Sequence, residues 1–107
     1  MFVDVAGLPV SERKPGWHGR FFDSANMTFG YWEVAAGSDL HEHSHPQEEV
    51  WHVLEGELEM TVAGVREVVR SGMAAVVPAN VPHSARALTD CRTIVVDYPT
   101  RESIGSG

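Results

Sequence analysis

The sequence has few basic residues, a single cysteine and no long apolar run. Eight lysines and arginines stand against fifteen aspartates and glutamates, giving a net charge of −7, and the basic residues form no stripe that could neutralise a phosphate backbone. We therefore expect no nucleic-acid partner. The apolar stretches are far shorter than the roughly 20 residues needed to cross a bilayer, and no basic segment leads into an apolar one at the N-terminus. This favours a cytoplasmic protein with no membrane contact.

The lone cysteine, Cys91, cannot form an internal disulfide, which agrees with a reducing compartment. We interpret Cys91 as a small buried hydrophobe rather than as a nucleophile. The 107 residues, of which 43% are apolar and 21% charged, are typical of one globular domain spanning 1–107. A chain of this length buries roughly 65% of its unfolded surface, which is enough for one core.

Glycine and proline divide the chain at short, fairly even intervals, so the segments between them are too short for ordinary helices. Short strands with regular turns are typical of antiparallel sandwiches and barrels, so we predict an all-β antiparallel fold. Hairpins should reverse at Gly56 and at Ala63-Gly64, where glycine permits a positive φ. The segments that alternate in the manner of strands are 28–35, 51–54, 58–62, 65–70, 73–77 and 92–98.

The two ends of the chain are harder to interpret. Residues 1–20 form an N-terminal segment without a clear pattern, and we expect the tail 101–107 to be loose. The apolar segment 2–10 is a candidate strand for pairing with a neighbouring chain, because open sheet edges must be paired, covered or charged. We therefore predict a homodimer.

Residues 37–56, GSDLHEHSHPQEEVWHVLEG, concentrate histidine and carboxylate side chains. Alternate side chains of an extended strand share one face, although Pro46 interrupts the pattern and makes parity only a guide. The residues of equal parity are His41, His43, His45 and Glu49.

His83 comes from a distant segment, directly after the proline-rich turn 78–82, which fixes its position. Together with His43, His45 and Glu49 it would supply three neutral imidazoles and one carboxylate. This donor set suits Fe, Mn, Ni, Zn or Cu, and it leaves two positions open if the ion is octahedral. Such open positions are where a substrate or dioxygen would bind.

Two motifs in this chain resemble those of the cupin superfamily. In the first, the fixed residues are Gly37, His43, His45, Glu49 and Gly56, and in the second they are Gly72, Pro78, Asn80 and His83. The resemblance covers roughly residues 27–98. It implies a jelly-roll β-barrel that holds a metal ion inside through three histidines and one glutamate, which in this chain are His43, His45, Glu49 and His83.

The second motif departs from the usual pattern at two positions. Asn80 stands where glycine is usual, and asparagine tolerates the left-handed backbone that the turn requires. Ala87 stands where the motif closes on asparagine, which removes a polar side chain from the pocket but no ligand.

The pocket wall is predicted from alternation. Trp51, Met60 and Val62 should face inward beside the metal, where core and pocket wall are the same surface. His41 is either a pocket residue or a surface residue at the barrel mouth. The sequence leaves open which of Tyr31 and Trp32 points inward. We interpret the remaining histidines, His18 and His52, as structural or surface residues.

Proteins that resemble this one include metal-dependent dioxygenases, isomerases and decarboxylases, as well as domains that bind small molecules without catalysis. Our leading hypothesis is a small metalloenzyme, dioxygenase-like or another oxidoreductase or isomerase, that acts on a small oxygen-bearing molecule. One divalent ion per chain is expected, with Fe(II) or Mn(II) favoured and Zn(II), Ni(II) or Cu(II) as alternatives. The alternative is a non-catalytic binding or sensing module, because no acid or base is evident beyond the four ligands.

Overall fold

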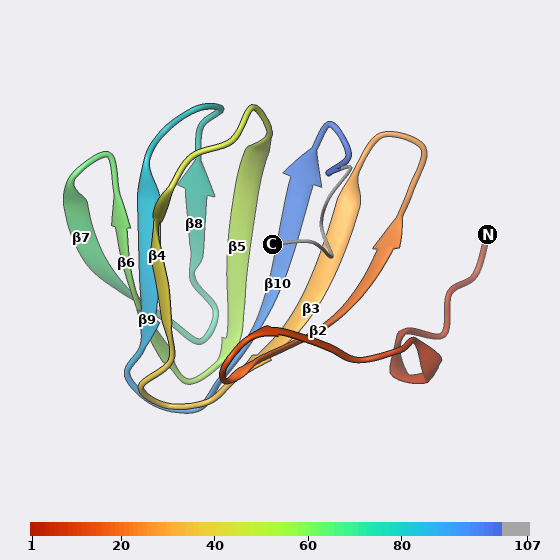
Figure 1. Cartoon of the computed structure of the whole chain (residues 1–107), viewed down its shortest axis with the longest axis horizontal. Coiled ribbons are helices and arrows are strands. Elements are labelled where there is room, and N and C mark those ends of the chain that lie inside the picture. The colour runs from red at the N-terminus through yellow and green to blue at the C-terminus, as the bar shows by residue number, and fades with distance from the viewer. Residues whose placement is uncertain (102–107) are drawn as a thin grey trace.

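The computed structural model describes residues 1–101, and nearly all their regular structure is β (Figure 1). A single turn of 3-10 helix, η1 (Val5–Gly7), precedes the first strand, and no helix in this part of the chain is long and apolar enough to cross a bilayer. The strands are β1 (Ser11–Lys14), β2 (Trp17–Asp23), β3 (Thr28–Val34), β4 (Asp39–His43), β5 (Glu48–Glu55), β6 (Glu57–Val62), β7 (Val65–Arg70), β8 (Ala74–Val77), β9 (His83–Ala87) and β10 (Cys91–Tyr98).

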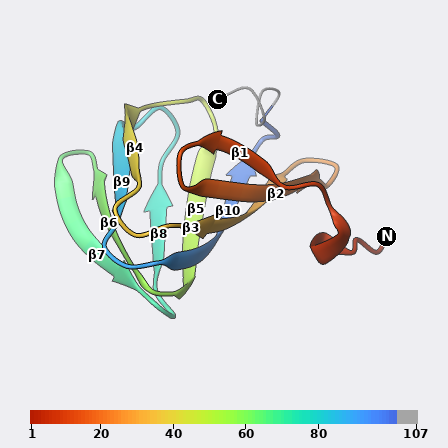
Figure 2. The same ribbon diagram turned by 60° about the horizontal axis from the view of Figure 1, so that its bottom comes forward.

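The strands form two sheets that face each other around one core. The six-stranded sheet has the order β1-β2-β3-β10-β5-β8, and the four-stranded sheet has the order β4-β9-β6-β7. Neighbouring strands are antiparallel throughout both sheets. The β1–β2 hairpin crosses the open side between the sheets (Figure 2). The predicted all-β jelly-roll barrel is therefore confirmed.

Alternation along the strands builds the core. Val53, Leu58 and Met60 are at most 1% exposed, and on β10 Cys91 and Val95 are buried with the same parity. Burying an aliphatic side chain of this size contributes roughly 1.5–3 kcal/mol each. The core therefore fixes the register of β5, β6 and β10, and with it the direction in which their polar residues point.

All six segments predicted as strands are strands, and four further strands were not predicted: β1, β2, β4 and β9. On β9 the inward positions carry His83, Ala85 and Ala87, so hydrophobic alternation does not mark the strand. Strand β4 is similarly obscured, because four of its five residues are polar.

The N-terminal segment differs from the prediction. Residues 2–10 form no strand; they contain η1, and the Phe2 side chain is exposed. The prediction of an edge strand here is wrong, because these residues make the local bonds of a 3-10 turn, from Gly7 N–H to the Asp4 carbonyl and from Leu8 N–H to the Val5 carbonyl.

The predicted turns are confirmed. Gly56 and Gly64 have φ angles of 83° and 79°, and they close the β5–β6 and β6–β7 hairpins. Asn80 takes the left-handed conformation with φ 64°, as the substitution of asparagine for glycine in the second motif predicts.

Candidate metal centre

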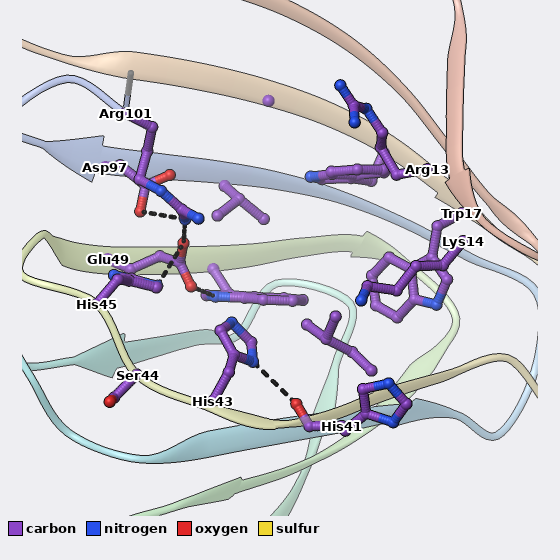
Figure 3. A pocket seen from close by; sticks show the side chains of 15 residues that line it. Arg13, Lys14, Trp17, His41, His43, Ser44, His45, Glu49, Asp97 and Arg101 are labelled. Atoms are coloured by element: carbon purple, nitrogen blue, oxygen red, sulfur yellow. Dashed lines mark hydrogen bonds and ion pairs between the residues drawn. The ribbon is translucent and has the colours of Figure 1, made fainter. Parts of the chain in front are cut away.

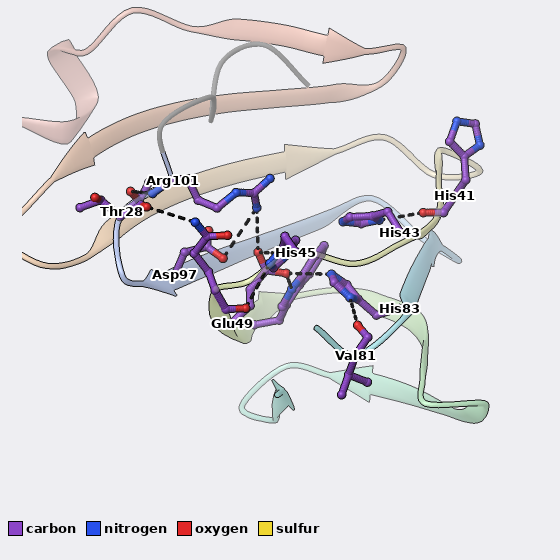
Figure 4. A network of polar contacts seen from close by, with 12 residues as sticks. Thr28, His41, His43, His45, Glu49, Val81, His83, Asp97 and Arg101 are labelled. Carbon is purple, nitrogen blue, oxygen red and sulfur yellow. Dashed lines mark hydrogen bonds and ion pairs between the residues drawn. The ribbon is translucent and has the colours of Figure 1, made fainter. Parts of the chain in front are cut away.

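Three histidines and one glutamate meet between the two sheets (Figure 4). His43 ends β4, His45 lies in the following loop, Glu49 is the second residue of β5 and His83 begins β9. One ring nitrogen from each histidine lies within 4.8 Å of those of the other two. Glu49 Oε2 lies 3.5 Å from His45 Nε2, and Glu49 Oε1 lies 3.2 Å from His83 Nε2. The fold therefore brings together the four side chains that the sequence predicts as ligands.

Each imidazole is oriented by a backbone carbonyl two residues away. His43 Nδ1 donates to the His41 carbonyl at 2.8 Å, and His45 Nδ1 donates to the Gln47 carbonyl at 3.1 Å. His83 Nδ1 donates to the Val81 carbonyl at 2.9 Å. A proton on Nδ1 leaves Nε2 of the neutral ring with its lone pair exposed. These bonds thus present three Nε2 lone pairs to one small volume, as metal-binding histidines require.

Two of these nitrogens are buried without a hydrogen-bond partner, namely Nε2 of His45 and of His83. Each faces an oxygen of Glu49, so a lone pair opposes a carboxylate unless a cation or a proton lies between them. Buried polar groups normally have hydrogen-bond partners, so two unpartnered nitrogens at one place indicate a missing partner such as a metal ion. The donor set of three imidazoles and one carboxylate fits a divalent transition metal.

The pKa shifts of two histidines have different causes. Burial lowers the pKa of His43, so its ring is neutral near pH 7 and able to bind a metal. Burial also acts to lower the pKa of His83, but the nearby Glu49 carboxylate and the bond to the Val81 carbonyl outweigh it, and the net pKa is raised. A metal ion would take the place of the proton that His83 shares with Glu49.

Glu49 is 3% exposed and remains ionised. Burial acts to raise its pKa, but the close polar side chains of His45, His83, Asp97 and Trp51 outweigh burial and hold the pKa well below its usual range. Several neighbouring polar groups thus stabilise the buried negative charge of Glu49. The ionised carboxylate can bind a cation.

Asp97 is a buried carboxyl group that sequence reasoning missed. It is the register partner of Glu49 across β10 and β5, is 1% exposed, and forms a second close group with His45 and Glu49. Burial, together with the hydrogen bond and negative charge of Glu49, raises the pKa of Asp97 to about 9, although Arg101 acts in the opposite direction. Asp97 could have been predicted from alternation along β10, because it lies on the same face as Cys91, Thr93 and Val95, which are all buried.

Arg101 was expected to belong to a loose tail, but the structure holds it at the site. Its backbone N–H donates to Thr28 Oγ1 at 2.9 Å, and its Nη1 lies 3.5 Å from Glu49 Oε2 and 3.8 Å from Asp97 Oδ1. The rest of the predicted tail, residues 102–107, lies outside the described part of the chain.

A cavity of about 310 Å³ adjoins the cluster (Figure 3). Its tryptophans pack edge to face, with ring centroids 5.7 Å apart for Trp17 and Trp32 and 6.1 Å apart for Trp17 and Trp51. Trp32 therefore faces inward, whereas the adjacent Tyr31 stacks on Phe22. The apolar lining residues are Trp17, Trp32, Leu40, Trp51 and Val95.

The structure corrects the predicted pocket wall in part. Trp51 lines the cavity, but Met60 and Val62 do not. Their strand, β6, pairs with β9 so that Val62 lies opposite His83, and β9 separates it from β4, which supplies the cavity wall. Met60 is instead a core residue with 1% exposure, and Val62 packs against the core.

The other histidines lie at the surface. His41 is exposed at the rim of the cavity, and its carbonyl rather than its ring contacts the cluster through His43. His52 is exposed on β5, and His18 pairs with Glu12 at 3.3 Å. Cys91 is buried, as predicted.

Two curated proteins are similar to this chain in sequence. An uncharacterised protein of Streptomyces coelicolor is 32% identical over 81 residues, which cover 75% of this chain and 77% of that protein. The H2HPP isomerase of Bacillus subtilis is 38% identical over 65 residues, which cover 60% of this chain and 28% of the isomerase. The chain thus matches only about a quarter of the isomerase's length.

Solved structures share the fold at lower identity. An RmlC-like cupin from Shewanella frigidimarina has a TM-score of 0.89 at 24% identity, with 94% of this chain and 92% of that chain covered. KdgF from a Halomonas species has a TM-score of 0.88 at 20% identity, covering 97% and 96%. Oxalate decarboxylase of Bacillus subtilis, described with Mn(II) centres, has a TM-score of 0.80 at 20% identity, covering 96% of this chain and 29% of its own.

The family model named Cupin_2, "Cupin domain", matches residues 30–97, which include both motifs from His43 to His83 and most of the two sheets. This protein is therefore a member of the cupin family.

Proposed function

We propose that this cupin is a small metalloenzyme that acts on an oxygen-bearing small molecule at a mononuclear site. The proposed ligands are His43, His45, Glu49 and His83. The observation that carries the proposal is the cluster of three imidazoles, two of which point a buried, unpartnered Nε2 at the ionised carboxylate of Glu49. Four ligands leave two positions of an octahedral ion for a substrate.

One divalent ion per chain is expected, with Fe(II) or Mn(II) as the favoured metal. The Mn(II) centres of the structurally similar oxalate decarboxylase support this choice. Zn(II), Ni(II) and Cu(II) bind nitrogen ligands more tightly than Fe(II) or Mn(II), so the metal found in a preparation depends on its supply.

The substrate class follows from the charge and shape of the site. Three neutral imidazoles and one carboxylate leave a divalent ion with a net charge of about +1, which attracts an enolate, phenolate or carboxylate oxygen. The apolar wall formed by Trp51 and its neighbours excludes water and favours a hydrophobic substrate body. When bound, the metal would supply Lewis-acid or redox chemistry to that oxygen.

The chain's own residues prepare this site. The Nδ1 bonds fix the three imidazoles, and the indole N–H of Trp51 holds Oε1 of Glu49. Of the reactions considered, an isomerisation agrees with the name of the isomerase relative.

The first test is metal content. Elemental analysis should find about one ion per wild-type chain, and a much lower content in His45→Ala and His83→Ala, because each variant loses one metal bond. His52→Ala, which removes an exposed histidine on β5, serves as the control and should retain its metal. Full metal content in the His45→Ala, His83→Ala double variant would refute the site.

The second test is turnover. The Fe(II)- or Mn(II)-loaded protein is screened without oxygen and then in air against small enols, catechols and β-dicarbonyls. At least one should bind and then be converted, with or without oxygen consumption, and the conversion should be lost in Glu49→Ala. Binding without conversion for every metal and ligand would indicate the alternative, a non-catalytic binding or sensing module.

A further inference from the structure

Two neighbouring cations on β1, Arg13 and Lys14, line the cavity. Within residues 1–101, neither has a carboxylate or a hydrogen-bond acceptor against its side chain. Arg20 donates to the Leu8 carbonyl. The five arginines that pair with a carboxylate within 3.9 Å are Arg66, Arg70, Arg86, Arg92 and Arg101. Among the lysines and arginines, the two without such a partner in the described part of the chain thus both line the cavity.

A β-bulge explains how two consecutive residues reach the same cavity. Glu12 pairs with His18 and Lys14 pairs with Trp17, so Arg13 is an extra residue in β1. Consecutive side chains of a regular strand point to opposite faces, but a bulge redirects them. The nearby acid, Glu12, does not neutralise this pair, because its Oε2 accepts the Gly16 N–H at 3.1 Å and lies 3.3 Å from His18 Nε2.

The cavity therefore has two chemically different ends (Figure 3). Glu49, Asp97 and His45 lie at one end, where Arg101 pairs with both carboxyl groups, and Lys14 lies at the other end beside Trp17. Apolar side chains, including Leu40 and Trp51, form the wall of the same cavity. At roughly 30 Å³ per water, the cavity's 310 Å³ corresponds to about ten water molecules, which is room for one small ring with its substituents.

We propose that Lys14, with Arg13 adding positive charge to the same cavity, binds the carboxylate of a substrate whose opposite end offers an enol or phenol oxygen to the metal. The role of the metal end depends on the proposed function above. The role of the cationic end depends only on Arg13 and Lys14 of β1. A carboxylate accepts hydrogen bonds from both a guanidinium and an ammonium, and such charge-assisted bonds are the strong ones. The substrate class is then a small, flat, apolar carboxylic acid with an enol or phenol oxygen remote from the acid group.

The proposal is tested with two catechols that differ only in a carboxylate. Catechol and 3,4-dihydroxybenzoate are titrated calorimetrically into the Mn(II)-loaded protein without oxygen, so that no turnover occurs. The benzoate derivative should bind about tenfold more tightly, as one charge-assisted contact predicts. Lys14→Gln and Arg13→Gln should each reduce this advantage, and the double variant should abolish it while catechol affinity and Mn content stay unchanged.

Arg66→Gln is the matched control, because it removes the same charge from β7, where Arg66 is exposed and pairs with Glu59. It should retain the tenfold advantage. Equal affinity of the wild type for the two catechols, or an advantage that survives in the double variant, would overturn the inference and leave the proposed metal site standing.

A metal-independent measurement separates the two proposals. Benzoate binding to the metal-free protein is measured by saturation-transfer NMR. We expect weak binding to the wild type and to His45→Ala, and no binding to the Arg13→Gln, Lys14→Gln double variant. If catechol fails to bind the loaded protein, the proposed function is wrong, and benzoate binding that depends on Lys14 still supports the cationic end. If the double variant still binds benzoate, the assignment of the cationic end is wrong.

Discussion

Trp51 donates its indole N–H to Glu49 across 2.5 Å between Nε1 and Oε1. The two residues are separated by one position on β5, so their side chains share the inward face, and each is 3% exposed. A hydrogen bond to a charged group is strengthened where water is excluded. This bond therefore fixes the one carboxylate of the proposed metal centre.

Trp51→Phe should weaken metal binding about tenfold, as loss of a bond that orients a ligand typically does. Affinity is measured by competition with a chromogenic chelator. Trp17→Phe is the control, because the Trp17 indole donates to the Asp39 carbonyl at 3.1 Å and not to Glu49. Equal losses in the two variants would mean that ring packing, rather than the bond to Glu49, matters.

Arg101→Gln should bind the divalent metal more tightly, by about fivefold, because Arg101 and the ion are like charges at one carboxylate. The metal-free variant should melt at a lower temperature, since Glu49 and Asp97 lose a partly buried cation. Chelator competition and thermal melts check the two effects. Arg92→Gln, which breaks only the exposed pair with Glu55, should change neither. Weaker metal binding by Arg101→Gln would show instead that Arg101 positions Glu49.

Gly56→Ala should destabilise the fold more than Gly64→Ala. Both glycines have a positive φ, which costs alanine about 1–2 kcal/mol. A methyl group at Gly56 would also collide with the carbonyl of Asp90, whereas one at Gly64 meets nothing within 4 Å. Each further ~1 kcal/mol lowers the melting temperature by roughly 4–8 °C in a domain of this size. Similar melting temperatures for the two variants would contradict the role assigned to Asp90.

Cys91 should resist alkylation in the folded protein. Burial raises the pKa of its thiol, so less reactive thiolate is present at pH 8 than in an exposed cysteine, and the reaction should accelerate only at higher pH. The rate with a chromogenic disulfide reagent, compared before and after unfolding in guanidinium, checks this. Equal rates in the two states would show that the site opens freely.

The protein should be a homodimer, with about twice the 11.7 kDa mass of the chain by light scattering at micromolar concentration. The sheets end in the edge strands β1, β8, β4 and β7, and exposed apolar side chains such as Val76 lie on β8. A mass near that of one chain would contradict the prediction.

The strands that could be predicted from the sequence are those whose inward residues are apolar. On β6, Leu58 and Met60 alternate with polar residues, and the structure buries both. Strands β4 and β9 escaped prediction because some of their inward positions carry His43 and His83. The residues proposed for chemistry are the ones that break the hydrophobic pattern.

The four proposed ligands were found from spacing because they belong to two short motifs. Asp97, Arg101 and Lys14 were not, because their positions depend on long-range pairing. Asp97 faces Glu49 through the β10–β5 register, and Arg101 is bonded to Thr28 from 73 residues earlier. Lys14 reaches the cavity beside a bulge in the pairing of β1 with β2.

The carbonyls that orient the three histidines lie only two residues from each of them along the chain. The orientation of the three imidazoles is therefore set within short segments of the chain, independently of the residues on β1. Lys14 at the far end of the cavity belongs to β1, an edge strand that forms no hydrogen bond to those carbonyls within residues 1–101. Substitutions or a one-residue deletion there could change which molecules are accepted while leaving the ion in place, so ligand preference and metal retention can diverge independently.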